Sequence, residues 1–199
     1  MLRIVMKMEI NRASEIVLLL ISASFAAQQE PSPSVSVGAG LESLSHGFYY
    51  QSAQEWKKLE ITSSSGFRTT HGASALAGVP PGVVRLYGGS EAANQLENRR
   101  PVFGVRVDPA RPDNPGMTVR DLLIVRMAKK KDYRELEVMH GGFASQRVGL
   151  NGKEIVEATL TTVADRTFIL VPKTDLARGE YLITFSAANG TAGYEFSIK

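Results

Sequence analysis

Apolar and polar residues alternate along most of the chain after residue 45. In the C-terminal run Tyr194–Ile198 the apolar side chains fall on one face and the polar ones on the other, and the run Tyr181–Phe185 has the same spacing. A period of two residues is typical of half-buried β-strands, and no window of about a dozen residues carries a good helical stripe. The pattern therefore predicts a chain built almost entirely of strands.

Turn-forming residues divide this pattern into roughly ten strands, spaced about 8–12 residues apart. Asn189-Gly190, Ala164-Asp165 and the polar run Lys129–Asp132 each lie between two alternating segments and predict hairpins. Many short strands with regular turns indicate an all-β fold, and we expect an antiparallel β-sandwich, immunoglobulin-like or similar. The other strands are expected at His46–Gln51, Trp56–Ile61, Val83–Tyr87, Val102–Val107, Leu122–Met127, Tyr133–Met139, Ile155–Val163 and Arg166–Val171.

One stretch, Thr62–Gly82, does not follow the alternation. It is rich in Ser, Gly and Ala, and such clusters between periodic segments are typical of loops. We expect a long loop here, or a loop with a short helical turn around Gly72–Ala77.

The N-terminal segment has the pattern of an export signal. Residues 1–15 carry basic side chains, and Ile16–Ala27 form a run of twelve residues without a charge. A run of that length is too short to span a bilayer, which takes about 20 residues, and is typical of the apolar region of a signal peptide. The small residues Ser24 and Ala26 favour cleavage after Ala26. A buried N-terminal helix is the alternative interpretation.

Three segments follow from these patterns. We expect a signal peptide at residues 1–26, a flexible Pro/Ser/Gly spacer at 27–44 and a β-sandwich domain at 45–199. Met6 or Met8 is an alternative start to Met1. Export would place the mature chain in the periplasm or outside the cell, with no transmembrane segment.

The composition excludes several kinds of functional site. The 199 residues include no cysteine, which excludes disulfides, thiol catalysis and cysteine-bound metal. The three histidines, His46, His71 and His140, are far apart in the sequence and form no zinc-binding motif. We therefore expect no metal and no cofactor. An exported chain without disulfides is more typical of a bacterial cell envelope than of a small eukaryotic secreted domain.

Sequence motifs assign no catalytic residue. The strings nearest to a nucleophile elbow, such as Gly89-Ser90-Glu91, lack the second glycine of that motif. Glu135 and Glu137 lie on one strand face about 7 Å apart, a spacing that permits the carboxylate pair of a glycoside hydrolase. A solvated strand face explains the same two residues more simply. A secreted hydrolase acting on glycans is thus the alternative to a protein without catalytic activity.

Basic residues concentrate in residues 99–134, which hold ten of them against four acidic residues. Lys129, Lys130 and Lys131 are expected at an exposed hairpin tip between two strands. There they either guard a sheet edge against aggregation, which we favour, or attract a partner such as an anionic glycan or an envelope protein. A nucleic-acid partner is not expected, because no recognition motif is present.

Aromatic residues form a second candidate surface near the start of the domain. Tyr49 and Tyr50 are adjacent on a strand and therefore face opposite sides, and Trp56 is the sole tryptophan. Exposed aromatic rings stack on sugars or on partner proteins. Packing of Trp56 and one tyrosine in the core is the favoured alternative.

A more specific motif lies in residues 176–181, where Leu176, Gly179 and Tyr181 have the L-x-x-G-x-Y spacing of a tyrosine corner. In a tyrosine corner the hydroxyl hydrogen-bonds to backbone a few residues upstream. The neighbouring Glu180 points to the opposite face, and we expect its replacement to have little effect on stability. This region resembles the penultimate strand of immunoglobulin-like and fibronectin-like domains, which implies a fold family and no activity.

A wider resemblance covers three stretches of the chain. GFYYQ with EWKKLE in residues 47–60, RRPVFGVRV in 99–107, and GEYLITF with GYEFSIK in 179–199 look like parts of a group of secreted bacterial proteins whose activity is uncharacterised. The resemblance implies export and a β fold. Together with the patterns above, it leads us to expect an exported, non-enzymatic binding or structural module of the bacterial cell envelope.

Overall fold

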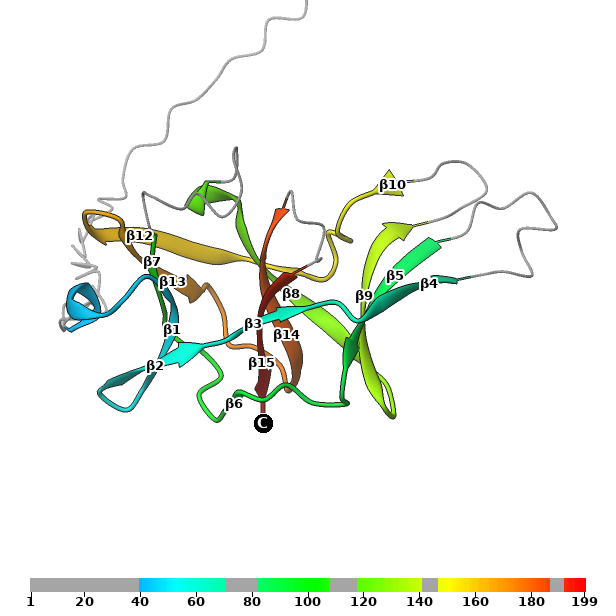
Figure 1. The fold of residues 1–199 in the computed structure, drawn as a ribbon, viewed down its shortest axis with the longest axis horizontal. Helices are drawn as coiled ribbons and strands as arrows, with labels where there is room; N and C mark the ends of the chain where they lie inside the picture. The colour runs from blue at the N-terminus through cyan, green and yellow to red at the C-terminus, as the bar shows by residue number, and fades with distance from the viewer. Residues whose placement is uncertain (1–39, 71–81, 108–117, 141–146, 187–191) are drawn as a thin grey trace, which may run out of the picture. The chain divides into compact units, whose positions relative to one another are not determined.

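The computed structural model describes residues 40–70, 82–107, 118–140, 147–186 and 192–199 (Figure 1). These residues form strands in two antiparallel sheets, with two short 3₁₀ helices, η1 (Leu41–Ser43) and η3 (Val119–Asp121). The predicted all-β class is confirmed. Four predicted features lie outside the described residues: the signal peptide, residues 27–39 of the spacer, the helical turn around Gly72–Ala77 and the turn at Asn189-Gly190.

The smaller sheet has five strands in the order β12-β13-β7-β1-β2, and every neighbouring pair is antiparallel. The β12–β13 hairpin turns at Asp165-Arg166, one residue later than the sequence predicts, because Ala164 still pairs with Thr167. Arg166 takes the positive φ of 53° that so tight a turn demands. The bounds are β12 (Ala158–Ala164), β13 (Thr167–Pro172), β7 (Phe103–Arg106), β1 (Gly47–Ser52) and β2 (Glu55–Leu59).

The larger sheet follows the path β3-β15-β14-β8-β9-β5-β4, and three short strands are attached to it. Its neighbours on the path are antiparallel. The path consists of β3 (Ile61–Ser63), β15 (Ala192–Ile198), β14 (Gly179–Phe185), β8 (Leu122–Lys129), β9 (Tyr133–His140), β5 (Gly82–Gly88) and β4 (Gly66–Thr70). The attached strands are β6 (Gln95–Leu96) on β15, β10 (Arg147–Val148) on β9 and β11 (Ile155–Val156) on β8.

The larger sheet curls into a half-barrel, and the chain itself links its two edges. β3 and β4 stand at opposite ends of the strand path, yet Ser64 and Ser65 alone separate them in sequence. In Figure 1 they run on from one another across the front of the molecule. The backbone N–H of Ser65 donates to the carbonyl of Leu86 in β5 at 2.8 Å, which ties this bridge to the far edge.

Two sequence expectations are corrected along this bridge. The predicted strand Trp56–Ile61 is divided at Glu60, because β2 belongs to the smaller sheet and β3 to the larger one. The long loop expected from Thr62 is wrong for residues 66–70, which form β4. The edge strand β4, GFRTT, lacks the apolar–polar alternation that marks an interior strand, so its pattern is that of a loop.

The main core lies between the two sheets and is almost entirely apolar. Phe103 of the smaller sheet meets Phe196 of the larger one with ring centroids 4.8 Å apart, and Phe48 stacks on Tyr194 at 3.9 Å. Among the buried residues of this described core, Tyr181 is the one with a polar side-chain atom. The buried members are Phe48, Leu59, Leu96, Phe103, Val105, Leu122, Ile124, Leu170, Leu176, Tyr181, Ile183, Phe196 and Ile198.

A second core fills the inside of the curl, and a third covers the outer face of the smaller sheet. The second core contains Tyr87, Val125, Met127, Leu136, Val138 and Leu182. In the third, Leu41 is fully buried with Tyr49 and Ile169. Leu41 therefore packs with the domain, although the sequence places it in the spacer at 27–44.

Candidate functional site

The tyrosine corner forms at the start of β14. The Tyr181 hydroxyl donates to the carbonyl of Ala177 at 2.7 Å, and both Tyr181 and Leu176 are buried. Gly179 has a φ of 152°, and a Cβ there would stand 3.4 Å from the guanidinium of Arg126. Burial raises the pKa of the Tyr181 hydroxyl, so it stays protonated and able to donate. The three motif residues thus have the structural role that the sequence predicts.

The aromatic candidates are packed into the protein. The Tyr49 ring is 4% exposed, and its hydroxyl donates to the carbonyl of Ser45 at 2.8 Å. Tyr50 points to the other side of β1 and packs on the main core, while Trp56 packs against the third core. Trp56 comes so close to Gly104 that a Cβ at that glycine would be 3.0 Å from the indole ring. Both faces of β1 are covered, so these three rings do not form a stacking platform.

The three lysines lie at the β8–β9 hairpin, and two of them have carboxylate partners. The Lys129 ammonium is 2.6 Å from Glu91, and this hydrogen bond lowers the pKa of Glu91 below its usual value. Lys130 lies 3.5 Å from Glu135. Lys131 is exposed, as is expected of a hairpin tip. The pairing reduces the positive charge that the hairpin presents to a partner.

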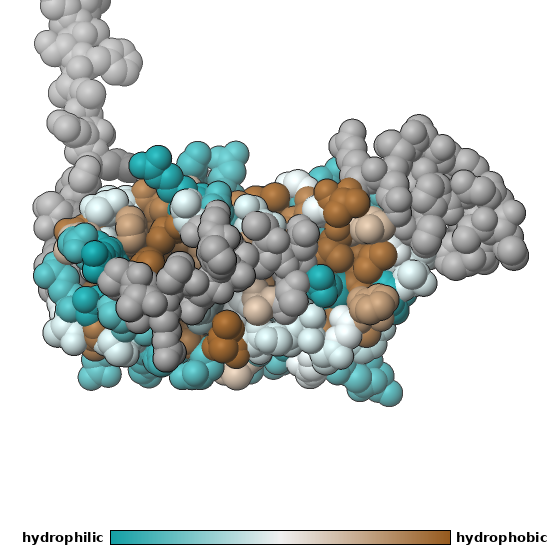
Figure 2. Space-filling model, turned by 45° about the horizontal axis from the view of Figure 1, so that its top comes forward, coloured by the Kyte–Doolittle hydropathy of each residue, from teal (hydrophilic) through white to brown (hydrophobic). Residues whose placement is uncertain are grey.

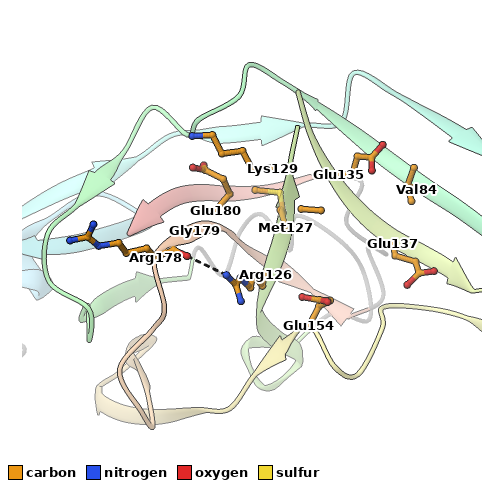
Figure 3. Close-up of a pocket in the computed structure, with 11 residues that line it drawn as sticks. Val84, Arg126, Met127, Lys129, Glu135, Glu137, Glu154, Arg178, Gly179 and Glu180 are labelled. Atoms are coloured by element: carbon orange, nitrogen blue, oxygen red, sulfur yellow. Dashed lines mark hydrogen bonds between the residues drawn. The ribbon is translucent and has the colours of Figure 1, made fainter. Parts of the chain in front are cut away.

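A pocket of about 590 Å³ lies beside β8 where the partner strand of β8 changes (Figure 3). β9 pairs with β8 only at Ala128 and Lys129, and β11 takes its place at Ile124 and Val125. Charged side chains from the two sides of this fork line the open pocket. They are Arg126, Lys129, Glu135, Glu137, Glu154, Arg178 and Glu180, together with Val84, Met127, Ala128 and Gly179.

The carboxylate pair singled out from the sequence lies in this pocket. Glu135 accepts hydrogen bonds from Arg68 at 2.7 and 2.5 Å. Glu137 has His140 at 3.0 Å and accepts from the amide of Asn151 at 2.9 Å. The Glu135 side chain is only 7% exposed, so the expectation of a solvated strand face is wrong for this residue. It is buried because Arg68 of the edge strand β4 reaches across β5 to cover it.

Glu180 is buried inside the curl. Its Oε2 accepts the backbone N–H of Ala92 at 2.8 Å and lies 3.9 Å from Nη1 of Arg134. Burial raises the pKa of Glu180, and the Ala92 N–H and Arg134 oppose the shift in part. The sequence correctly places Glu180 on the face opposite Tyr181. The expectation that its replacement has little effect is corrected, because that face is the interior of the half-barrel.

Sequence reasoning did not single out four exposed arginines around the tyrosine corner. Arg99 Nε donates to the carbonyl of Leu176 at 2.9 Å, and Arg100 Nε donates to that of Pro172 at 3.1 Å. Arg126 Nη2 donates to the carbonyl of Arg178, the fourth member, at 3.2 Å. The excess of basic residues in 99–134 was the available signal, but Arg178 lies outside that stretch, and only the fold brings the four together.

Apolar surface does not identify a further site. On the face in Figure 2 apolar residues gather at the curled end of the larger sheet. Phe67 and Val148, which are 70% and 71% exposed, belong to β4 and β10, next to the limits of the described ranges 40–70 and 147–186. Their exposure therefore does not define a docking surface.

No further candidate site comes from metal-binding clusters or membrane-spanning helices among the described residues, or from known proteins. Within the described ranges, no group of three or more His, Asp or Glu residues is placed to hold a metal ion. No helix among the same residues is long and apolar enough to cross a membrane. No family model, curated protein or solved structure matches this chain.

Proposed function

We propose that this chain is a non-enzymatic binding or structural module exported to the bacterial cell envelope. The observation that carries this proposal is the state of three of the four carboxylates that line the pocket. Arg68 and Lys130 hold Glu135, His140 and Asn151 hold Glu137, and Glu180 is buried beside Arg134. A glycoside hydrolase needs one carboxyl group that releases its proton and one that attacks or activates water. Carboxylates committed to internal donors are poorly suited to either role.

Export is supported by the uncharged run Ile16–Ala27 and the small residues before the cleavage point. A periplasmic or extracellular location follows from it. The expected partners are an envelope protein or an anionic glycan.

We also propose that the two sheets form an immunoglobulin-like sandwich around the main core. The strand order β12-β13-β7-β1 follows the D-E-B-A order of such domains, and β15-β14-β8 follows their G-F-C order. β9 takes the position of strand C′, and the tyrosine corner lies at the start of β14, the equivalent of strand F. The strands β2 to β5 are additions to that plan. This order supports a fold family and no particular function.

A hydrolysis assay tests the proposal against its alternative. The mature chain is incubated with neutral and acidic polysaccharides, and new reducing ends are measured beside a Glu135→Gln/Glu137→Gln variant. We expect no new reducing ends above background from either protein. Turnover by the wild-type chain that the double variant lacks would establish the secreted hydrolase and overturn the proposal.

A further inference from the structure

We propose that the arginines around the tyrosine corner form a binding surface for an acidic polysaccharide, a linear chain bearing carboxylate or sulfate groups. This arginine surface consists of Arg99, Arg100, Arg126 and Arg178. The inference rests on the proposed binding function and gives it a site and a class of ligand.

The surface is organised by one segment of backbone. Three of the four guanidinium groups bond to carbonyls between Pro172 and Arg178, and the fourth belongs to Arg178 itself. The backbone N–H of Leu176 also donates to the carbonyl of Arg99 at 2.7 Å, which fixes residues 99–100 alongside this segment. Seven extended residues span at most about 25 Å, so the four charges form a short row.

Arg99 and Arg100 keep both terminal guanidinium nitrogens for an outside partner, whereas Arg126 uses Nη2 for its internal bond. Arg99 and Arg100 use Nε for their internal bonds, and all four residues are exposed. A guanidinium bound through Nε still presents both terminal nitrogens, whose spacing matches the two oxygens of a carboxylate or sulfate. Within the described part of the chain, none of the four forms a salt bridge with a carboxylate.

Arg126 and Arg99 both lie close enough to the corner for their charges to act on the Tyr181 hydroxyl. The charges of Arg126 and Arg99 both lower the pKa of Tyr181, against the effect of burial, and Glu154 raises it. Figure 3 shows the Arg178 side chain extending away from Arg126, on the far side of their hydrogen bond. The charges are therefore spread along the surface rather than focused on one point, which suits a chain with repeated negative charges.

Few acidic groups compete for these arginines. Glu154 lines the pocket with Arg126, and Asp175 is exposed on the organising segment. Glu157 is paired with Lys173 at 3.0 Å. The four guanidinium groups thus outnumber the nearby unpaired carboxylates, whereas Lys129 of the hairpin is paired with Glu91 and Lys130 shares Glu135 with Arg68.

Affinity measurements with two probes test the surface. Binding of the mature chain to heparin and to polygalacturonate is measured at low salt, with neutral dextran and the acidic polypeptide polyglutamate for comparison. The variants are Arg99→Gln/Arg100→Gln and Arg126→Gln/Arg178→Gln, and the matched control is Lys129→Gln/Lys130→Gln/Lys131→Gln. We expect each arginine variant to lose about tenfold or more in affinity, and the lysine control to lose less than about threefold. Thermal unfolding checks that each variant is folded.

Substitution by lysine separates charge from shape. Arg99→Lys/Arg126→Lys keeps two positive charges but loses the planar fork, so its affinity should lie between those of the wild-type and glutamine proteins. Equal losses from the arginine and lysine-hairpin variants would overturn the site while leaving a binding module in place. Absence of wild-type binding to both polysaccharides, or tighter binding to polyglutamate, would overturn the ligand class. Cleavage of a probe would instead contradict the proposed function.

Discussion

The two cores of the larger sheet are built by the same strands and differ in polarity. On β14, Tyr181 and Ile183 enter the main core, while Glu180 and Leu182 enter the curl. The main core meets a second sheet and is almost purely apolar. The curl meets only its own sheet and encloses a buried arginine, Arg134, with two carboxylates. Apolar–polar alternation along a strand therefore does not show that the polar side faces solvent, because in the curl the polar side is buried as well.

The charged groups in the curl are imperfectly balanced. Arg134 donates to the carbonyls of Gly88 and Gly89 at 2.6 and 3.1 Å. Its Nη1 lies 2.8 Å from Oε2 of Glu195, close enough for an ion pair but without the alignment of a hydrogen bond. One guanidinium faces two carboxyl groups, and burial raises the pKa of Glu180 against the opposing effect of Arg134. The main core has no such cluster, so charge and pH should affect the two cores differently.

The largest effect on the free energy of unfolding is expected from a substitution that breaks the ion cluster in the curl. Arg134→Met leaves Glu180 and Glu195 buried without their cation, and we expect a loss of about 3–5 kcal/mol in the free energy of unfolding. Denaturant unfolding at neutral pH measures it. The triple variant Arg134→Met/Glu180→Gln/Glu195→Gln removes all three charges but keeps an acceptor for the Ala92 N–H. It should recover about 2 kcal/mol of the loss; a triple variant as unstable as the single one would mean that uncompensated charge is not the cause.

A smaller effect is expected when the hydroxyl of Tyr181, the polar side-chain atom of the main core, is removed. Tyr181→Phe leaves the carbonyl of Ala177 without its partner, which should cost about 1–3 kcal/mol in the free energy of unfolding. Tyr49→Phe is the matched control, since it removes the same kind of bond, to a carbonyl four residues upstream, from the third core, which lies outside the space between the two sheets. We expect the control to lose less than about 1 kcal/mol. Equal losses would show that the corner has no special role.

The smallest effect is a change in how the free energy of unfolding depends on pH. The pKa of Glu180 is raised in the folded protein, so between about 4.3 and that raised value the folded chain holds a proton that the unfolded chain has lost. The free energy of unfolding therefore falls as the pH rises through this window. Glu180→Gln lacks the titration and should gain stability relative to the wild type over the same range. Urea unfolding from about pH 4 to 8 measures the difference; a relative gain by the wild type would contradict it.

The sequence predicted local strands well and the curl not at all. The pattern at Tyr181–Phe185 and Tyr194–Ile198 identifies a hairpin because both strands alternate and neighbour each other in sequence. The curl depends on pairs distant in sequence, such as β3 with β15, and on β4, whose residues lack any alternation. Nothing local to Glu180 distinguishes a strand face that meets solvent from one that is enclosed by β5 and β9.

For the candidate sites too, the sequence predicts only the features that residues close in sequence form. The motif in residues 176–181 was readable because its hydrogen bond closes over four residues. The arginine surface joins residues 77 and 72 positions apart through carbonyl bonds, which leave no mark in the sequence. Charge density pointed instead to the lysine hairpin, where the partners Glu91 and Glu135 come from distant positions.

The bridge between β3 and β4 also governs how the interior of the curl exchanges with water. Ser63 of β3 is paired with Ala192 of β15, and Ser65 is hydrogen-bonded to Leu86 of β5. Ser64 is therefore the one residue between the two attached ends of the bridge. One residue spans no more than about 3.6 Å, which leaves the bridge no slack. The curl therefore cannot widen gradually: the buried guanidinium of Arg134 gains full access to solvent when an edge pairing breaks. Exchange of its N–H hydrogens with bulk water should then run at the rate of that local unfolding event, not at the rate of side-chain motion.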